Sequence, residues 1–526
     1  DGDLTISGNA HIVNAIGGNG DSSNSRSDAG DGIRAGTLTI SGEAHIDNAT
    51  GGTADSGSAG DGIYSYGKLT IKDNAKIGTV KGGDATASGK DGGCGIRNHG
   101  QFTMSGGTIT NAVGGTSTGR DGGDGIYCGD TLTIEGGEIK QTTGGTATGD
   151  GGYGIRGNVA LTIKGGKIQQ TTGGKATGSH GIGGTGIGSN GTLTIAGGEI
   201  QQATGGNATG TLGTGGSGIR GGSGWSGGSS NKIVEISGGT ITKAKGGDGK
   251  ASGGYGIRSD GDLKIEGGTI GSLTTDDNGK QIPAPTTGAL GGNAATGEQG
   301  GHGIYSKGQL FISGSADITN AKGGDGKTSG GDGIRSDKEF NISGGKIEQA
   351  TGGNSTDGTG GYGIHSGSML TISDSANITN ATGGSGRSGG SGIFGSVMKI
   401  ISSTIGTAKG GEGKTSGGNG IYGVGKLTIS DNAAITNATG GNADNGTGGS
   451  GIYSDGKLTI ENSTITNATG GDADNGTGGD GIHGDGNSDK LYIYKVNITN
   501  ATGGSGKRGG SGLFGKILEI ISSDIR

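Results

Sequence analysis

The sequence predicts an all-β protein, namely a parallel β-helix (β-solenoid) with three strands per coil and about 16 coils of roughly 30 residues. Three observations lead to this prediction. Near-copies of one segment, which reads "GSGIYSDGKLTIENSTITNATGG" at 449–471, recur along the whole chain. Within each copy, apolar residues alternate with threonine as they do in a half-buried strand. Glycine-rich corners separate these short apolar stretches, and no helical pattern lies between them.

An isoleucine that follows glycine marks each repeat. Successive markers lie 28 to 33 residues apart, except for intervals of 38 and 47 residues near the middle of the chain. Self-similarity at such a period is typical of a solenoid, whereas a β-propeller would need four strands and about 40 residues per repeat. The markers are Ile33, Ile63, Ile96, Ile126, Ile155, Ile187, Ile219, Ile257, Ile304, Ile334, Ile364, Ile393, Ile421, Ile452, Ile482 and finally Leu513.

Each repeat contains three predicted strands in a fixed order. The first is Gly-Ile-Tyr/Arg, as at Ile452, and the second is Leu-Thr-Ile, as at 458–460. The third is Ile-Thr-Asn-Ala-Thr, as at 465–469. We expect Leu and Ile of the second strand to point inward and its Thr to point outward. Each strand should pair with its own copy in the coils above and below.

A double glycine follows the third strand in nearly every repeat, from 17–18 to 503–504. We expect a corner there, where the backbone takes a positive φ or passes close to the neighbouring coil. The stretch that comes next, such as 442–449, varies in length and composition. It is therefore expected to be an exposed loop.

The composition agrees with a solenoid that has a thin core. The chain has 141 glycines among 526 residues and only 26% hydrophobic residues, too few to fill several globular cores. We expect one solenoid domain over 1–526, as a fragment of a longer rod or a subunit in one. Irregular coils are expected at about 221–231, which holds the only tryptophan, Trp225, and at 271–291, which holds both prolines.

Charge, hydropathy and cysteine positions argue against a nucleic-acid groove, a membrane span and a disulfide. A formal net charge of −7 argues against a nucleic-acid groove, and no apolar run approaches the length of a membrane span. The chain begins at Asp1 without an apolar leader, so an export signal is expected to have been removed or to lie outside it. Cys94 and Cys128 should lie too far apart along their strands for a disulfide, and we expect two free thiols.

A column of amides lies two positions after the isoleucine of the third strand. By strand alternation we expect it to point inward and to form a ladder of hydrogen bonds between coils. Several of its asparagines also begin Asn-x-Thr glycosylation sequons, but inward side chains could not carry glycans, so the structural ladder is favoured. The asparagines are Asn14, Asn48, Asn111, Asn320, Asn380, Asn437, Asn467 and Asn500, and Gln141, Gln170, Gln202 and Gln349 occupy four of the other positions.

Two stretches carry a family resemblance. Residues 105–115, "SGGTITNAVGG", and 343–353, "SGGKIEQATGG", resemble the glycine-rich repeat regions of secreted or wall-attached bacterial surface proteins. More broadly, the chain is similar to the pectin-lyase-like right-handed β-helix superfamily. The resemblance implies an extracellular location and an adhesive, carbohydrate-binding or stalk role.

The residues that directly follow the markers form the candidate ligand-binding site. They should face outward, and they concentrate the scarce arginines and tyrosines of the chain in one column. Two explanations stay open: the side chains stack on one another for stability, or they stack on sugar rings and grip acidic groups. Together with Trp225, the candidate residues are Arg34, Tyr64, Arg97, Tyr127, Arg156, Arg220, Arg258, Tyr305, Arg335, His365, Tyr422, Tyr453 and His483.

These observations predict a non-catalytic extracellular solenoid, a rigid stalk or fibre subunit with glycan binding along that column. The expected partners are glycans or other copies of the chain, and no cofactor or metal site is expected. One alternative is a polysaccharide lyase or hydrolase, but the aspartates before the Gly-Ile step form no local cluster in the sequence. An ice-binding protein is a weaker alternative, because residues such as Glu235 and Phe311 interrupt the column of outward threonines.

Overall fold

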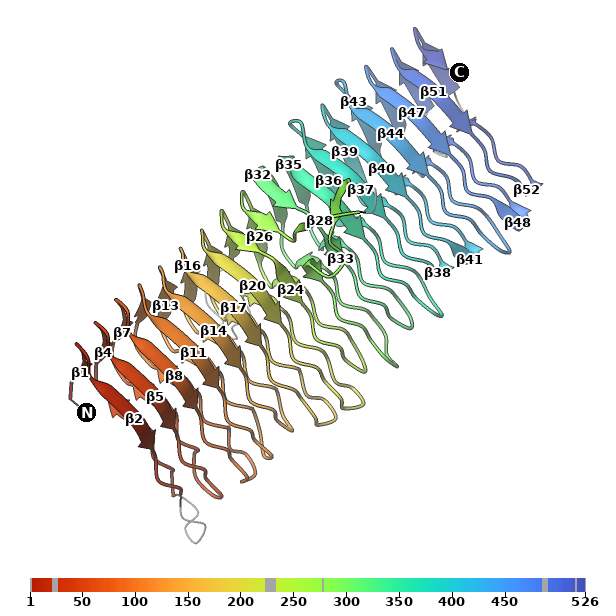
Figure 1. Ribbon diagram of the computed structural model, residues 1–526. Helices are drawn as coiled ribbons and strands as arrows, with labels where there is room; N and C mark the ends of the chain where they lie inside the picture. Colours follow the sequence, from red (N-terminus) through yellow and green to blue (C-terminus); the bar gives the residue numbers. More distant parts are fainter. Residues whose placement is uncertain are drawn as a thin grey trace. The chain divides into compact units, whose positions relative to one another are not determined.

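The computed structural model describes residues 2–20, 27–222, 233–276, 279–484, 491–515 and 518–525. Every regular element in these ranges is a β-strand. The chain contains two compact units, residues 1–262 and 263–526. Within each unit, parallel strands stack as successive turns (Figure 1). The predicted all-β solenoid is therefore confirmed, whereas the prediction of one domain stays a prediction.

Three strands build most turns, and each pairs with its own copy one turn away. In unit 1, β6 (Ile63–Ser65) pairs with β9 (Ile96–Asn98), β7 (Leu69–Ile71) with β10 (Phe102–Met104), and β8 (Lys76–Lys81) with β11 (Thr108–Val113). The chain makes about 17 turns rather than 16. The additional turn precedes the first marker, because β1 (Leu4–Ile6) and β2 (His11–Ile16) pair with β4 (Leu38–Ile40) and β5 (His45–Thr50).

The remaining strands fall into the same three classes. First strands are β3 (Ile33–Ala35), β12 (Ile126–Cys128), β15 (Ile155–Gly157), β18 (Ile187–Ser189), β21 (Ile219–Gly221), β25 (Ile257–Ser259), β31 (Ile304–Ser306), β34 (Ile334–Ser336), β42 (Ile421–Gly423), β45 (Ile452–Ser454), β49 (Ile482–Gly484) and β53 (Leu513–Gly515). Second strands are β13 (Thr131–Ile134), β16 (Ala160–Ile163), β19 (Thr192–Ile195), β22 (Ile233–Ile236), β26 (Asp262–Ile265), β43 (Leu427–Ser430), β46 (Leu458–Glu461), β50 (Leu491–Tyr494) and β54 (Leu518–Ile521). Third strands are β14 (Glu138–Thr143), β17 (Lys167–Thr172), β20 (Glu199–Thr204), β23 (Thr240–Ile241), β24 (Lys243–Lys245), β27 (Thr269–Ile270), β30 (Gly288–Leu290), β33 (Ala321–Lys322), β37 (Asn377–Thr382), β40 (Thr404–Lys409), β44 (Ala434–Thr439), β47 (Thr464–Thr469), β51 (Asn497–Thr502) and β55 (Asp524–Ile525).

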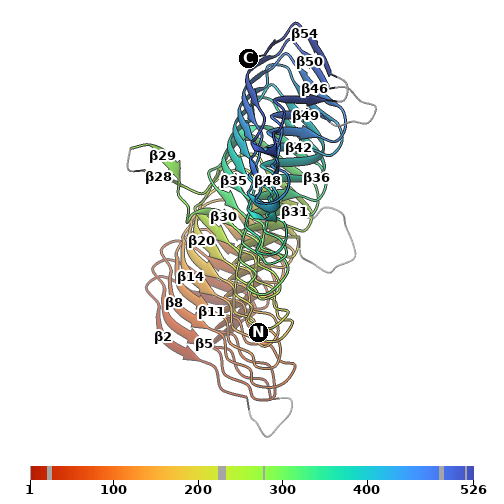
Figure 2. The same ribbon diagram turned by 90° about the vertical axis from the view of Figure 1, so that its right-hand side faces the viewer.

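Some strands of unit 2 merge or lie outside the three classes. The first and second strands are continuous in β36 (Ile364–Ser373) and β39 (Ile393–Ile401), and the second and third in β32 (Leu310–Ile318) and β35 (Phe340–Thr351). Short loop strands pair in parallel, β38 (Gly386–Ser388) with β41 (Gly413–Ser416) and β48 (Ala473–Thr477) with β52 (Gly506–Arg508). The predicted irregular coil at 271–291 contains an antiparallel hairpin of β28 (Leu273–Thr275) and β29 (Gln281–Pro283), which projects from the stacked turns (Figure 2).

The core follows the predicted alternation in the first and second strands. In β7, Leu69 and Ile71 are fully buried, and Thr70 lies between them on the outer face. Aliphatic side chains of the same type pair in register from turn to turn, as Leu38 does with Leu69 and Ile40 with Ile71. Cys94 and Cys128 are free, as predicted, and both are buried.

The prediction that the amide column points inward is wrong. The third strand buries two residues three positions apart, such as Ile109 and Ala112, so the alternation breaks between them and two successive side chains face outward. Asn14, Asn48 and Asn500 are exposed, Asn111, Asn380, Asn437 and Asn467 are half-buried, and only Asn320 is buried. The ladder nevertheless forms at the surface, because the Asn467 amide donates to Asn437 Oδ1 (2.9 Å) and accepts from Asn500 (2.8 Å).

The double-glycine corner depends on close approach, not on a positive φ. A Cβ added to Gly145 would lie 1.8 Å from the carbonyl oxygen of Gly115 in the preceding turn. Positive φ occurs instead between the second and third strands, for example at Gly107 (75°) and Gly137 (81°). The corner therefore requires glycine because neighbouring backbones are in contact there.

Candidate functional site

The predicted Arg/Tyr column exists, and consecutive turns place its members side by side. On the outer side of the first strands, Arg34 pairs in register with Tyr64, Tyr64 with Arg97 and Arg97 with Tyr127. Unit 2 contains the corresponding run Tyr305, Arg335, His365, Phe394, Tyr422, Tyr453, His483 and Phe514.

Exposure along the column differs from the expected open stripe. Most members are half-buried, but Tyr305 and His365 are each only 9% exposed, so their faces are not accessible. The phenol of Tyr305 donates to Asp337 Oδ2 (2.5 Å). Trp225 and most of the 221–231 insertion lie outside the described residues.

A buried aspartate two positions before the marker explains much of the column, and sequence reasoning missed its role. Oδ1 of Asp61 accepts the backbone N–H of Cys94 in the next turn, and Oδ2 lies 2.8 Å from Arg97 Nε. The same cap is formed by Asp124 with the N–H of Tyr153, by Asp332 with that of Tyr362, and by Asp480 with that of Ser511. Asn419 and His302 perform the same capping where aspartate is absent.

The second oxygen of each capping aspartate pairs with a cation of the column. The partner comes from the same turn in Asp31–Arg34 and Asp480–His483, whereas Asp332 contacts both Arg335 of its own turn and His365 of the next. Where the same turn carries tyrosine, the arginine of the next turn pairs instead, as in Asp61–Arg97 and Asp124–Arg156. The sequence signal for the first type is Asp-Gly-Ile-Arg/His, which occurs at 31–34, 332–335 and 480–483.

Burial strongly perturbs these carboxyls in two opposite ways. Asp61 is 4% exposed, and this burial raises its pKa to about 6, although Arg97 counteracts the effect. Burial also opposes ionisation of Asp332, but His365 Nδ1 at 2.8 Å, together with Arg335, holds the pKa of that carboxyl well below its usual range. The two carboxyls therefore shift in opposite directions, because burial dominates at Asp61 and the charged neighbours dominate at Asp332.

His302 is a buried neutral base within the same group. Its Nδ1 accepts the N–H of Asp332 at 2.7 Å, which places the ring proton on Nε2. Burial lowers its pKa to about 4. The ring also stacks on Tyr305, with centroids 5.4 Å apart.

Stacking within the column supports the structural explanation. The guanidinium carbon of Arg34 lies 4.6 Å from the centroid of the Tyr64 ring, and that of Arg258 lies 4.8 Å from the Tyr255 ring. Arg220 and Arg258 also share the carboxylate of Asp260, with Nε to oxygen distances of 2.8 and 2.7 Å. The arginines that were predicted to grip acidic ligands are therefore engaged with aspartates of the protein.

Grooves lie along the column in both units. One groove, in unit 2, has a volume of about 720 Å³ and lies between the rings of the column and the glycine-, serine- and threonine-rich segments near 388–391, 416–419 and 447–450. Its ring-bearing lining residues are Tyr362, Tyr422, Tyr453, His483 and Phe514. Unit 1 has a charged groove of about 460 Å³ beside Asp31, Asp61 and Arg97, and a smaller one beside Arg220 and Arg258.

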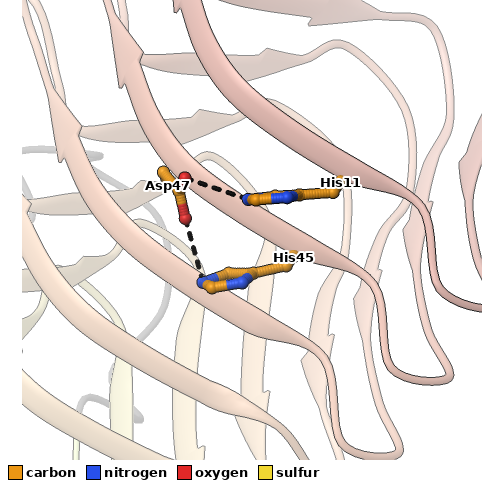
Figure 3. Close-up of side chains that lie close together, drawn as sticks. All are labelled: His11, His45 and Asp47. Carbon is orange, nitrogen blue, oxygen red and sulfur yellow. Dashed lines mark hydrogen bonds and ion pairs between the residues drawn. The ribbon is translucent and has the colours of Figure 1, made fainter.

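One further cluster has the composition of a metal site. His11, His45 and Asp47 lie together on the outer face of β2 and β5 (Figure 3). No metal site was predicted from the sequence, because the two histidines lie one repeat apart and only the register of the turns brings them together.

Comparisons with known proteins give no family. No protein-family model, no curated protein and no solved structure matches the chain. Within the described residues, we find no helix with the length and apolar character needed to cross a bilayer.

Proposed function

We propose that this protein is a non-catalytic extracellular β-solenoid, a stalk or fibre subunit that binds glycans through the aromatic groove of unit 2. One observation carries the proposal: several ring-bearing side chains line a single groove of about 720 Å³, which is within the range of ligand sites. Aromatic faces provide apolar contact area while polar groups beside them form hydrogen bonds, a combination that suits sugar rings.

Because of the repeat, ring-bearing side chains recur at regular intervals along the groove. Tyr422, Tyr453 and His483 are register neighbours in successive turns, with ring centroids 5.3 and 4.6 Å apart. Strand spacing is about 4.8 Å, so rings recur at that interval along the groove. A polymer with a short repeat would therefore meet the same type of contact several times, and weak contacts would add by multivalency.

The ion pairs favour neutral over acidic glycans. The arginines of the column in unit 1 pair with aspartates, and Asp480 pairs with His483 in the groove of unit 2, which Arg508 also lines. An acidic polymer would have to compete with these carboxylates for the same cations. We therefore expect neutral polysaccharides to bind more tightly than acidic ones.

The alternative of a polysaccharide-active enzyme gains no support from the charged groove. Asp31 and Asp61 lie there together, but Oδ1 of Asp31 accepts the N–H of Asp61 and both oxygens of Asp61 have partners. The same cap recurs in several other turns, as expected of a structural repeat.

Glycan binding is tested with neutral and acidic oligosaccharides on an array, followed by calorimetry on the best binder. The double variant Tyr422→Ala/Tyr453→Ala should lose about 1–3 kcal/mol of binding free energy, since two ring contacts are removed. Tyr492→Ala is the matched control, because Tyr492 lies in the same unit on a second strand. The proposal fails if no glycan binds, or if the double variant and the control bind equally well.

The stalk or fibre role is tested separately by negative-stain electron microscopy at several concentrations. Filaments that lengthen with concentration would support assembly of copies, whereas discrete particles at every concentration would restrict the proposal to a stalk.

A further inference from the structure

Two histidines and an aspartate converge on the outer face of the first two turns (Figure 3). His11 begins β2 and His45 begins β5, and the two are direct partners in the parallel register. Asp47 follows two positions after His45 and therefore faces the same side. Its Oδ2 lies 2.9 Å from His11 Nε2 and its Oδ1 lies 3.1 Å from His45 Nε2. The two imidazole rings are stacked, with centroids 4.9 Å apart and planes inclined by 13°.

We propose that His11, His45 and Asp47 bind one divalent transition-metal ion of the Zn²⁺ type. Imidazole nitrogen and carboxylate oxygen are ligands that Zn²⁺, Cu²⁺ and Ni²⁺ prefer, whereas Ca²⁺ and Mg²⁺ require sets of oxygen ligands. Three protein ligands leave the fourth tetrahedral position to water or to a group from another molecule.

The side chains can reach metal-binding distances without moving the backbone. One ligand atom from each residue lies within 4.8 Å of the other two. A tetrahedral Zn²⁺ site with bonds of about 2.0–2.1 Å has ligand atoms about 3.3 Å apart. The required closure is thus on the order of 1 Å, and rotation of the side chains supplies it because they are 49%, 43% and 32% exposed for His11, His45 and Asp47.

The cluster is not a product of the repeat. The position held by His11 and His45 is Lys76, Thr108 and Glu138 in the next three turns. Residues of the next turn limit the site to one ion, because Lys76 is the register partner of His45 and Gly78 lies beside Asp47. A histidine pair with a carboxylate two positions away therefore occurs at this one place among the described residues of unit 1.

The proposed ion would cross-link two successive turns. It would join β2 to β5 by side chains, in addition to their backbone hydrogen bonds, and it would stabilise the folded state by RT ln(1 + [metal]/Kd). At a free metal concentration of 100 times Kd this effect is a hundredfold change in the local opening equilibrium.

Calorimetric titration of the untagged full chain with ZnCl₂ at pH 7.5 tests the site. We expect a strong 1:1 phase that CaCl₂ does not produce. Because even outer-shell changes at zinc sites reduce affinity 10- to 100-fold, His11→Gln and Asp47→Asn should each weaken Zn²⁺ binding by about 100-fold or more.

His180→Gln is the control, since His180 is an exposed histidine in the same unit that lies outside the cluster, and it should bind as the wild type does. Far-UV circular dichroism verifies that the variants are folded. The proposal is overturned if the wild type shows no 1:1 Zn²⁺ phase, or if His11→Gln and Asp47→Asn retain wild-type affinity.

Discussion

The carboxylate of Asp61 lies beneath Arg97 of the next turn, with 2.8 Å between Oδ2 and Nε, and its other oxygen accepts the N–H of Cys94. One side chain thus satisfies a buried backbone donor and orients a member of the outer column. Through such aspartates, the arginines of the column link successive turns. These links predict how the stability of the turns responds to mutation and pH.

Arg97→Leu should destabilise the protein strongly at alkaline pH. At pH 8, above the pKa of about 6, Asp61 is ionised, and removal of Arg97 leaves a buried carboxylate without its cation. We expect the free energy of unfolding to fall by about 3 kcal/mol at pH 8. At pH 4.5 Asp61 is protonated, so the loss should be smaller. Urea unfolding at both pH values measures the difference.

Arg120→Leu is the matched control for this experiment. Arg120 and Asp91 form an exposed pair in the same unit, with side chains 62% and 48% exposed. Its loss should cost less than about 1 kcal/mol at either pH, since exposed pairs contribute little. Equal losses for Arg97→Leu at pH 8 and pH 4.5 would contradict the assigned role of Asp61.

His302→Asn should reduce acid sensitivity. The pKa of His302 is about 4 in the folded protein against 6.5 for an unperturbed histidine, so the folded state binds fewer protons than the unfolded state between these values. Its contribution is fully present above pH 6.5 and is lost as the pH falls toward 4, by about 3 kcal/mol. Asparagine at this position keeps the acceptor for the next turn, as Asn419 shows.

The measurement is the free energy of unfolding of both proteins from pH 7.5 to pH 4. Relative to the wild type, His302→Asn should gain stability progressively below pH 6.5. Parallel pH profiles for the two proteins would show that His302 titrates normally.

How far the sequence predicts this structure depends on the scale. The spacing of the apolar residues predicts the turns, the order of the strands and the inward direction of Leu69 and Ile71. Each strand has one buried face, which fixes the side on which its apolar residues lie. The prediction fails at Asn467, since strict alternation does not hold in the third strand, where two successive residues that are not buried lie between Ile465 and Ala468. It also misses the cluster of His11, His45 and Asp47: the alignment that pairs Asn14 with Asn48 pairs the two histidines as well, but it does not show that the Asp47 side chain reaches both rings.

The candidate site shows the same limit. The sequence identifies which residues form the column, but it does not show that Asp61 pairs with the guanidinium of Arg97, or that Tyr305 is buried. Both facts depend on side chains of adjacent turns, because Asp61 pairs with Arg97 and Tyr305 donates to Asp337.

Asn467→Ala should weaken the surface amide ladder. Asn467 donates to Asn437 and accepts from Asn500, so the change removes two inter-turn hydrogen bonds from a half-buried position. We expect a loss of about 1–2 kcal/mol in the free energy of unfolding. Thr466→Ala, on the adjacent outward position, is the control and should cost less. Equal effects would show that the ladder contributes nothing beyond strand propensity.

Gly145→Ala should be among the most damaging single methyl additions in unit 1. The new Cβ would lie 1.8 Å from the Gly115 carbonyl oxygen, and only backbone displacement can relieve that contact. We expect a cost of at least about 3 kcal/mol, at the upper end for overpacking. Gly18 provides the matched control, since it is the second glycine of the corresponding corner in another turn and an added Cβ there meets no atom within 4 Å. Gly18→Ala should change stability by less than about 1 kcal/mol. Hydrogen exchange of the amides of 115–152 gives the local readout: it should accelerate in Gly145→Ala and stay unchanged in Gly18→Ala, and equal exchange in both variants would show that the corner tolerates a side chain.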